Sequence, residues 1–261
     1  VRNYQNLRME SNQANAAALR AFRILDFIAQ HANGCPASAI VEALSLPKQT
    51  VHRIVTQLQL AGLLIREPGT RRVQLGARIS RFAINALMHG EGNRQRHAIL
   101  RGLVEDIGET CNLTVLAGSD VVYLDRVETA WPLRALLAPG SHVPLHATAS
   151  GKLLLALLPK PQRERLLRVL PLRPLTPHTI VDVKQLAREL EETRLRRVGI
   201  NRNEHLSGLI AVAVPVMLDR RRACAAVAVQ APIGRMTLEQ LLAKVPRMRA
   251  AADQIAQTLR I

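Results

Sequence analysis

The sequence predicts an α+β protein of two domains, an N-terminal winged helix-turn-helix domain followed by a GAF-like α/β domain. Two short amphipathic stretches, Ala37–Leu44 and Lys48–Gly62, follow each other closely and lead into a basic hairpin. From about residue 110 the pattern changes to short β-branched and aliphatic runs separated by turn residues. The chain has 261 residues, 48% of them hydrophobic, which is enough to fill two cores.

Four segments are expected along the chain. The first 16 positions are polar and rich in Asn and Gln, and the two glycines beside residue 91 interrupt a helical pattern. We therefore expect a disordered arm at 1–16, the winged helix-turn-helix domain at 17–76, a linker helix at 77–92 and the second domain at 93–261. The linker helix could act as a dimerisation strut or pack against its own domain.

The first domain begins with a helix predicted over Leu19–Gln30, which ends at Gly34. In the helix-turn-helix that follows, three residues separate the two helices, and each helix has one apolar face to bury against the other. Pro47 suits the first position of the second helix, where a missing N–H costs nothing. Donors that can reach base edges or phosphates lie in the exposed opening turns: Lys48, Gln49, Thr50, His52 and Arg53.

A hairpin is predicted directly after the second helix. Strands that start at Leu63 and Val73 flank turn residues at 68–70, and arginines lie beside them. A basic hairpin in this place is typical of the wing of a winged helix, which makes Arg71 and Arg72 candidates for DNA contact. The alternative is a structural helix pair with a solvated charge run. We favour double-stranded DNA as the partner because the helices, the turn and the hairpin have the expected order and spacing.

The net charge of +16 also indicates an anionic partner, usually nucleic acid. Arginines carry most of this charge and continue past the helix-turn-helix, so codon usage could account for part of it. RNA-binding or purely architectural roles would need aromatic stacking platforms, and aromatic residues make up only 2% of the chain.

Cysteine usage and hydropathy restrict the cellular setting. The three cysteines are far apart and form no CxxC pair, so the sequence indicates neither a disulfide framework nor a zinc knuckle. No apolar run has the length of a membrane helix, and the N-terminal residues do not resemble a signal peptide. We expect a cytoplasmic protein with no membrane association and no cofactor.

The second domain is predicted to open with a helix that ends near Thr110 and to close with one over Leu238–Leu259. Between them, a strand meander precedes a segment around His146–Lys152 that opens an apolar helix through Leu158. Two further helices and a strand pair complete the pattern, which is related to GAF and PAS domains. The predicted ranges are Leu113–Ala117, Val121–Val127 and Leu133–Leu137 for the meander, Pro161–Val169 and Val183–Arg197 for the helices, and Leu209–Leu218 and Cys224–Ala231 for the strand pair.

Catalytic and metal-binding alternatives are disfavoured. Ser150 and Lys152 could be imagined as a nucleophile and its base near His146, but no G-x-S-x-G motif surrounds the serine, and residues two apart on a helix point in different directions. A phosphate loop fails because His146 occupies the position of its first glycine. Cys111, His146 and His205 match no compact metal motif, so structural roles are favoured.

Three segments of the sequence resemble the IclR family of bacterial transcriptional regulators. Together they span nearly the whole chain in the family's order. The segments are Leu46–Ile54, similar to the family's recognition-helix opening; His146–Ala156, similar to the segment leading into the helix beside its ligand pocket; and Asn201–Glu204 with Gly208, Leu209 and the strand ending at Pro215-Val216, similar to the family's late strand.

The resemblance implies a ligand-responsive DNA-binding transcriptional regulator that forms dimers or dimers of dimers and binds a palindromic operator. Many members sense carboxylates or aromatic acids of a catabolic pathway, and a few sense apolar drugs or solvents and control efflux. The resemblance also implies an effector pocket at Ala135, Val143, Ala149, Ser150, Asn201, Leu209 and Ala211. Backbone N–H groups at the helix start near Ala149 and Ser150 suit an anion.

Three departures from the family pattern bear on the effector. Asn201 stands where many members have an acidic residue and Ala211 where many have cysteine, and the upstream Gly-Tyr of the family appears as Arg197-Val198. Asn201 does not repel a carboxylate and can donate a hydrogen bond as well as accept one. We expect a repressor of a catabolic operon that senses a monoanionic aromatic or branched organic acid. The alternative is a regulator of an efflux operon that senses neutral aromatic compounds.

Overall fold

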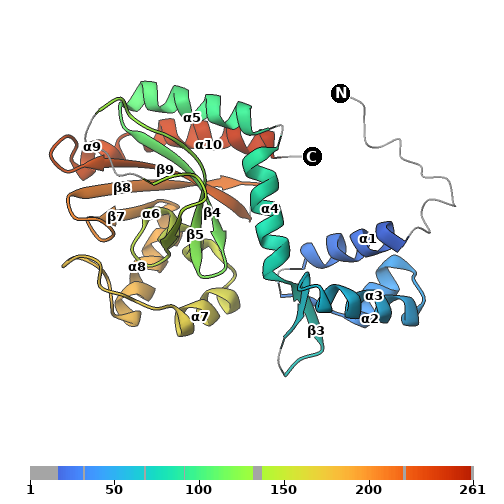
Figure 1. Cartoon of the computed structure of the whole chain (residues 1–261). Coiled ribbons are helices and arrows are strands. Elements are labelled where there is room, and N and C mark those ends of the chain that lie inside the picture. Colours follow the sequence, from blue (N-terminus) through green and yellow to red (C-terminus); the bar gives the residue numbers. More distant parts are fainter. Residues whose placement is uncertain are drawn as a thin grey trace. The chain divides into compact units, whose positions relative to one another are not determined.

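The computed structural model describes residues 17–31, 33–67, 69–90, 92–131, 137–219 and 222–259. The chain divides into two compact units, one ending at Ala83 and the other beginning at Ile84. Each unit has its own hydrophobic core. Figure 1 shows the helices and strands that make up the units. Among the described helices, none is long and apolar enough to cross a membrane.

The first unit consists of three helices and a small antiparallel sheet with strand order β1-β3-β2. Its elements are α1 (Ala17–Ala29), β1 (Cys35–Pro36), α2 (Ala37–Leu44), α3 (Lys48–Leu60), β2 (Leu64–Arg66) and β3 (Arg72–Leu75). The helix-turn-helix and the hairpin were predicted, whereas the two-residue strand β1 was not. Apolar residues at helical spacing fill the core from α1, α2 and α3, and one residue from each hairpin strand closes it.

The turn between α2 and α3 is held by a left-handed residue and a proline. Ser45 ends α2 with a φ of 51°. Pro47 is the N-cap of α3, so the prediction that it takes the first helical position is wrong. Its extended ψ of 136° keeps it outside the helix, while its carbonyl accepts the first helical bond from Val51 N at 3.1 Å.

Helix α4 (Ala77–His89) crosses the boundary between the two units. None of its described residues is fully buried. Near its end, Ile84, Leu87 and Met88 are half-buried and pack against the core of the second unit. The Arg96 guanidinium donates to the Leu87 carbonyl, which ties this end of α4 to α5 (Asn93–Ile107). The second half of α4 therefore belongs structurally to the second unit.

The second unit is built on a six-stranded antiparallel sheet with strand order β6-β5-β4-β9-β8-β7. Its strands are β4 (Thr110–Ala117), β5 (Asp120–Val127), β6 (His142–Pro144), β7 (Gly199–Arg202), β8 (Leu209–Met217) and β9 (Ala223–Pro232). Helices α5 and α10 cover one face of the sheet, and α6 and α8 lie on the other side (Figure 1). The α+β class is confirmed.

Alternating residues of the central strands serve two different purposes. Valines of β8 and β9, such as Val212 and Val227, point into the large core under α5 and α10. The opposite face carries alanines that pack with α6. Because alanine side chains are short, α6 approaches this face of the sheet closely. The alanines are Ala211, Ala213, Ala226 and Ala228.

Helices α6 (Ala149–Leu157), α7 (Lys160–Val169) and α8 (Val183–Arg196) agree with the prediction to within a few residues. Helix α5 ends at Ile107, earlier than predicted, because Gly108 takes a left-handed conformation with a φ of 80°. The strand β7 was not predicted. Of the predicted strand Leu133–Leu137, residues 133–136 lie outside the described residues, and Leu137 is not in a strand.

The closing segment forms two helices, α9 (Leu238–Leu242) and α10 (Val245–Thr258), so the prediction of one continuous helix is wrong. Pro246 explains the break. In a continuous helix its ring would clash with the Leu242 carbonyl, and it has no N–H to donate. At the start of α10 neither defect matters, because the first turn of a helix makes no such bond.

The division inside α4 leads to a prediction about fragments. We expect Ile84–Ile261 to fold alone and to unfold cooperatively in urea. A fragment that starts at Gly92 should fold with a free energy of unfolding lower by roughly 1–3 kcal/mol, because it lacks the apolar contacts of Ile84, Leu87 and Met88. Circular dichroism during urea titration measures both. Equal stability would show that the end of α4 adds nothing to this unit.

Candidate functional site

Helix α3 has one buried face and one exposed face. Val51, Ile54 and Val55 are buried in the core of the first unit. Of the predicted DNA-contacting residues of this helix, four are exposed, and Thr50 is half-buried. The exposed ones are Lys48, Gln49, His52 and Arg53. The helix therefore presents a polar, basic surface of the kind that enters the major groove.

The two predicted arginines of the hairpin have different surroundings. Both Arg71 and Arg72 are exposed. Arg72 uses its guanidinium within the domain, donating from Nε to the Asn33 carbonyl at 3.0 Å and from Nη2 to the Gly34 carbonyl at 2.8 Å. Gly34 has a φ of 64°, and a Cβ there would lie 2.4 Å from the Val73 carbonyl oxygen. Arg72 thus positions the hairpin against the turn before β1.

A cavity in the second unit lies between the start of α6 and the strands β4, β5, β8 and β9. Its empty volume is about 450 Å³, including its open mouth. The structure places six of the seven predicted pocket residues in its wall: Val143, Ala149, Ser150, Asn201, Leu209 and Ala211. The seventh, Ala135, lies outside the described residues.

The start of α6 is held by Thr148. Its side-chain oxygen accepts a hydrogen bond from Gly151 N at 3.1 Å and donates one to the Pro144 carbonyl at 2.8 Å. A Cβ on Gly151 would lie 2.4 Å from the Leu145 carbonyl oxygen, so glycine permits the chain to pass this close to itself. Ala149 and Ser150 form the first turn of the helix and both line the cavity, so their amides lie at the positive end of the helix dipole.

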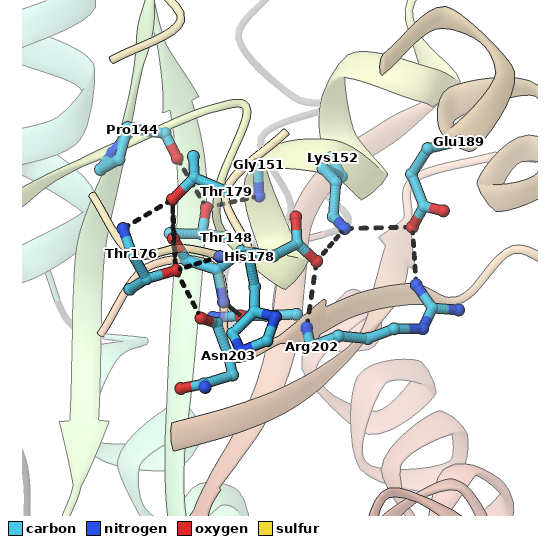
Figure 2. A network of polar contacts seen from close by, with 12 residues as sticks. Pro144, Thr148, Gly151, Lys152, Thr176, His178, Thr179, Glu189, Arg202 and Asn203 are labelled. Carbon is cyan, nitrogen blue, oxygen red and sulfur yellow. Dashed lines mark hydrogen bonds and ion pairs between the residues drawn. The ribbon is translucent and has the colours of Figure 1, made fainter. Parts of the chain in front are cut away.

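The same helix contains Lys152, whose side chain is completely buried. Its Nζ donates to Glu204 Oε1 at 2.6 Å and to Glu189 Oε1 at 3.0 Å (Figure 2). Arg202 joins this network through its own backbone N–H to Glu204 and its guanidinium to Glu189. The ion pairs connect α6 to α8 and to the turn after β7, which carries part of the cavity wall.

Two threonines hold this turn from the other side. Thr179 Oγ1 donates to the Glu204 carbonyl at 2.6 Å, and Thr176 Oγ1 donates to the Asn203 carbonyl at 2.7 Å (Figure 2). Asn203 has a φ of 65°, and its side-chain oxygen accepts a bond from Gly208 N at 2.6 Å. The turn that follows Asn201 is therefore fixed at both ends.

The residues considered for metal binding are not brought together. His146 is buried, and its Nε2 lies 2.9 Å from the Arg173 carbonyl, which requires the proton on that nitrogen. His205 lines the cavity, and burial together with nearby His146 lowers its pKa below the ordinary value. Burial raises the pKa of the Cys111 thiol far above the ordinary value. Within the described ranges, no group of three metal-ligating side chains was found.

Several polar residues of the cavity wall were missed from the sequence. Four of them come from β4, β5 and β9, which become neighbours only when these strands pair, and the fifth lies in the turn after β7. A possible signal was their polarity within otherwise apolar runs. These residues are Asn112, Thr114, Tyr123, His205 and Gln230.

Comparison with known proteins decides the family. Residues 89–257 match the domain family described as "Bacterial transcriptional regulator IclR C-terminal", and residues 18–72 match the MarR family. The chain belongs to the IclR family of bacterial transcriptional regulators. As a member of this family it is a DNA-binding regulator and not an enzyme.

Curated relatives and a solved structure agree with this assignment. The probable transcriptional regulator SauR of Cupriavidus necator is 56% identical over 248 residues, which cover 95% of this chain and 98% of the relative. The transcriptional repressor IclR of Escherichia coli is 30% identical, covering 84% and 80% respectively. An IclR homologue from Microbacterium hydrocarbonoxydans, solved in complex with 4-hydroxybenzoate, has a TM-score of 0.58 and 26% identity and covers 94% of this chain and 99% of its own.

The exposed position of Arg53 on α3 can be tested by substitution in this IclR-family chain. Arg53→Ala should weaken specific operator binding by roughly 1–3 kcal/mol if the guanidinium meets a base edge or a well-placed phosphate. A gel-shift titration at fixed salt measures this. Exposed Arg101, in the second unit, provides the control substitution to alanine. Equal affinity of Arg53→Ala and the wild type would remove Arg53 from the contacts.

The contribution of the buried Lys152 ion pairs to the free energy of unfolding can also be tested. Lys152→Met leaves the carboxylate of Glu204, which is only 3% exposed, without its cation, so the free energy of unfolding should fall by about 3–5 kcal/mol. Lys160→Met removes an exposed lysine 3.9 Å from Glu164 and should cost less than about 1 kcal/mol. Adding Glu204→Gln to Lys152→Met should restore part of the loss. Urea unfolding of the three variants would reveal whether the charge is needed.

Proposed function

We propose that this regulator represses a catabolic operon and that a small organic acid relieves the repression. In this proposal residues 17–76 bind a palindromic operator, residues 93–261 hold the effector, and the helix at 77–92 joins them. The protein acts in the cytoplasm, on double-stranded DNA, as a homodimer or a dimer of dimers. The repressor role is supported by the relative from Escherichia coli, the transcriptional repressor IclR.

The chemistry of the cavity supports an acid. Backbone amides of Ala149 and Ser150 stand at the start of α6, where the helix dipole favours a negative group. Val143, Leu209 and Ala211 supply apolar wall for the body of the molecule. The described residues that line the cavity include neither Asp nor Glu, so nothing in that wall repels a carboxylate. This combination carries the proposal.

The relative solved with 4-hydroxybenzoate gives independent support, because its ligand is an aromatic acid and its chain aligns with this one over most of its length. On these grounds we propose a monoanionic acid with an aromatic or branched body. The second candidate is a regulator of an efflux operon that senses neutral aromatic compounds. The apolar part of the wall would suit such compounds, but they would leave the amides at the start of α6 without an acceptor.

Filling the cavity should separate effector response from DNA binding. Ala149 is 3% exposed and lines the cavity, so Ala149→Leu should abolish the ligand response and leave operator affinity unchanged within about a factor of two. Ala250→Leu, on the exposed side of α10, is the matched control and should respond normally. Release of a labelled operator on adding effector measures the response. A normal response of Ala149→Leu would place the effector elsewhere.

The chemical class of the effector is tested by calorimetry on the full-length wild type. We expect heat of binding from benzoate-type or branched carboxylic acids and none from neutral aromatics of equal size, such as toluene or benzamide. Binding confined to the uncharged compounds would overturn the acid proposal and favour the efflux alternative.

A further inference from the structure

Three side-chain amides line the cavity, those of Asn112, Gln230 and Asn201. The oxygen atom of each accepts a hydrogen bond from another group of the protein. Asn112 Oδ1 accepts a hydrogen bond from Arg126 Nη1 at 2.9 Å. A guanidinium has no acceptor, so this contact fixes which end of the Asn112 amide is oxygen. Asn112 Nδ2 in turn donates to Gln230 Oε1 at 3.4 Å, which fixes the Gln230 amide. The buried Arg126 thus fixes the orientation of the Asn112 amide directly and that of the Gln230 amide through Asn112.

The third amide is fixed in the same way. Asn201 Oδ1 accepts a hydrogen bond from the backbone N–H of Glu204 at 2.7 Å, and a backbone N–H is always a donor. The amino groups of Asn201 and Gln230 have no other partner among the described residues, and both residues line the cavity. All three amides therefore offer hydrogen-bond donors to whatever occupies the cavity.

Two buried hydroxyls add to this set. Ser150 and Tyr123 are residues with exposed fractions of 5% and 6% that line the cavity, and their hydroxyls make no hydrogen bond to any described residue. Burial raises the pKa of the Tyr123 hydroxyl, so it keeps its proton and can donate. Neither hydroxyl oxygen is among the described buried polar atoms that lack a hydrogen-bond partner, so each keeps some accessible surface. Because both residues line the cavity, these hydroxyls are available to a polar ligand there.

These donors lie at two separate ends of the cavity. Asn201, Ala211 and Gln230 are neighbours in register across β7, β8 and β9. Adjacent strands are about 4.8 Å apart, so the backbones at Asn201 and Gln230 are separated by roughly 10 Å. A Cβ on Gly199 would lie 2.1 Å from the Ala149 carbonyl oxygen, so the start of α6 is packed against β7 and hence near Asn201. Asn112 and Gln230 form the other end, and Ala211 leaves space between them.

We propose that the effector is a two-ended acid: its carboxylate binds at Ala149, Ser150 and Asn201, and a second oxygen acceptor at its far end binds the amides of Asn112 and Gln230. This inference rests on the proposed function and narrows it. A hydrocarbon at the far end would leave the Gln230 amino group without a partner. A second carboxylate, or a hydroxyl or carbonyl oxygen, would accept a hydrogen bond from it. Arg126 is a positioning residue in this arrangement, since it acts through Asn112.

The test compares matched acids on the full-length protein by calorimetry. Succinate is paired with butyrate, and 4-hydroxybenzoate with 4-methylbenzoate, so that within each pair only the far-end group changes. We expect the two-ended acid to bind at least about tenfold more tightly than its partner in at least one pair. Equal affinity within both pairs would overturn the inference while leaving an acid effector in place. Failure of all four acids to bind would overturn the proposed function and this inference with it.

A substitution at Gln230 tests whether the preference for two-ended acids arises at the end of the cavity formed by Asn112 and Gln230. Gln230→Met keeps the length of the side chain and removes its donors, so the two-ended acid should lose about tenfold in affinity and its one-ended partner less than twofold. Gln254→Met, an exposed change of the same kind on α10, should alter neither. Operator binding and the urea midpoint verify that both variants are folded. If Gln230→Met weakened the binding of both acids of a pair equally, Gln230 would not be the residue that binds the second oxygen acceptor.

Discussion

The arrangement of the second unit around its cavity depends on the pairing of a fully buried positive charge, that of Lys152. Three leucines follow Lys152 directly in α6, and Lys152 is as buried as they are. Such a charge is tolerated only with close partners of opposite sign, and Glu204 and Glu189 supply them from the turn after β7 and from α8. These ion pairs hold α6, α8 and the turn after β7 together, although the three segments are far apart in the chain. The cavity wall at Asn201 and the start of α6 are parts of that arrangement.

Local patterns in the sequence predicted the local structure well. The apolar spacing in 37–62 specified α2 and α3 because each helix buries a face within its own unit, and the turn residues at 68–70 specified the hairpin. The closing helix was predicted too long because its apolar spacing runs through Pro246, although the backbone cannot. The strand β7 was missed because its four residues include only one aliphatic side chain and derive their register from β8.

The candidate site was predictable only where a family pattern covered it. Six cavity residues were named from that resemblance, but Asn112 and Gln230 are 118 positions apart and meet only through the pairing of β4 with β9. Lys152 could be identified from the sequence, whereas its partner Glu204, 52 positions later, could not. For Arg72, basicity and exposure suggested a contact with DNA, and only its bonds to the Asn33 and Gly34 carbonyls showed a role inside the domain.

The alanine-lined face of the sheet bears on how such a regulator can change during evolution. Two of its four alanines, Ala211 and Ala228, line the cavity as well as packing near α6, whereas the valines of β8 and β9 form a separate core on the opposite face. A single substitution at Ala211 or Ala228 would add a methyl or a hydroxyl to the wall and leave the main core intact. Selection could thus adapt this scaffold to a new metabolite in small steps, with few mutations lost to misfolding.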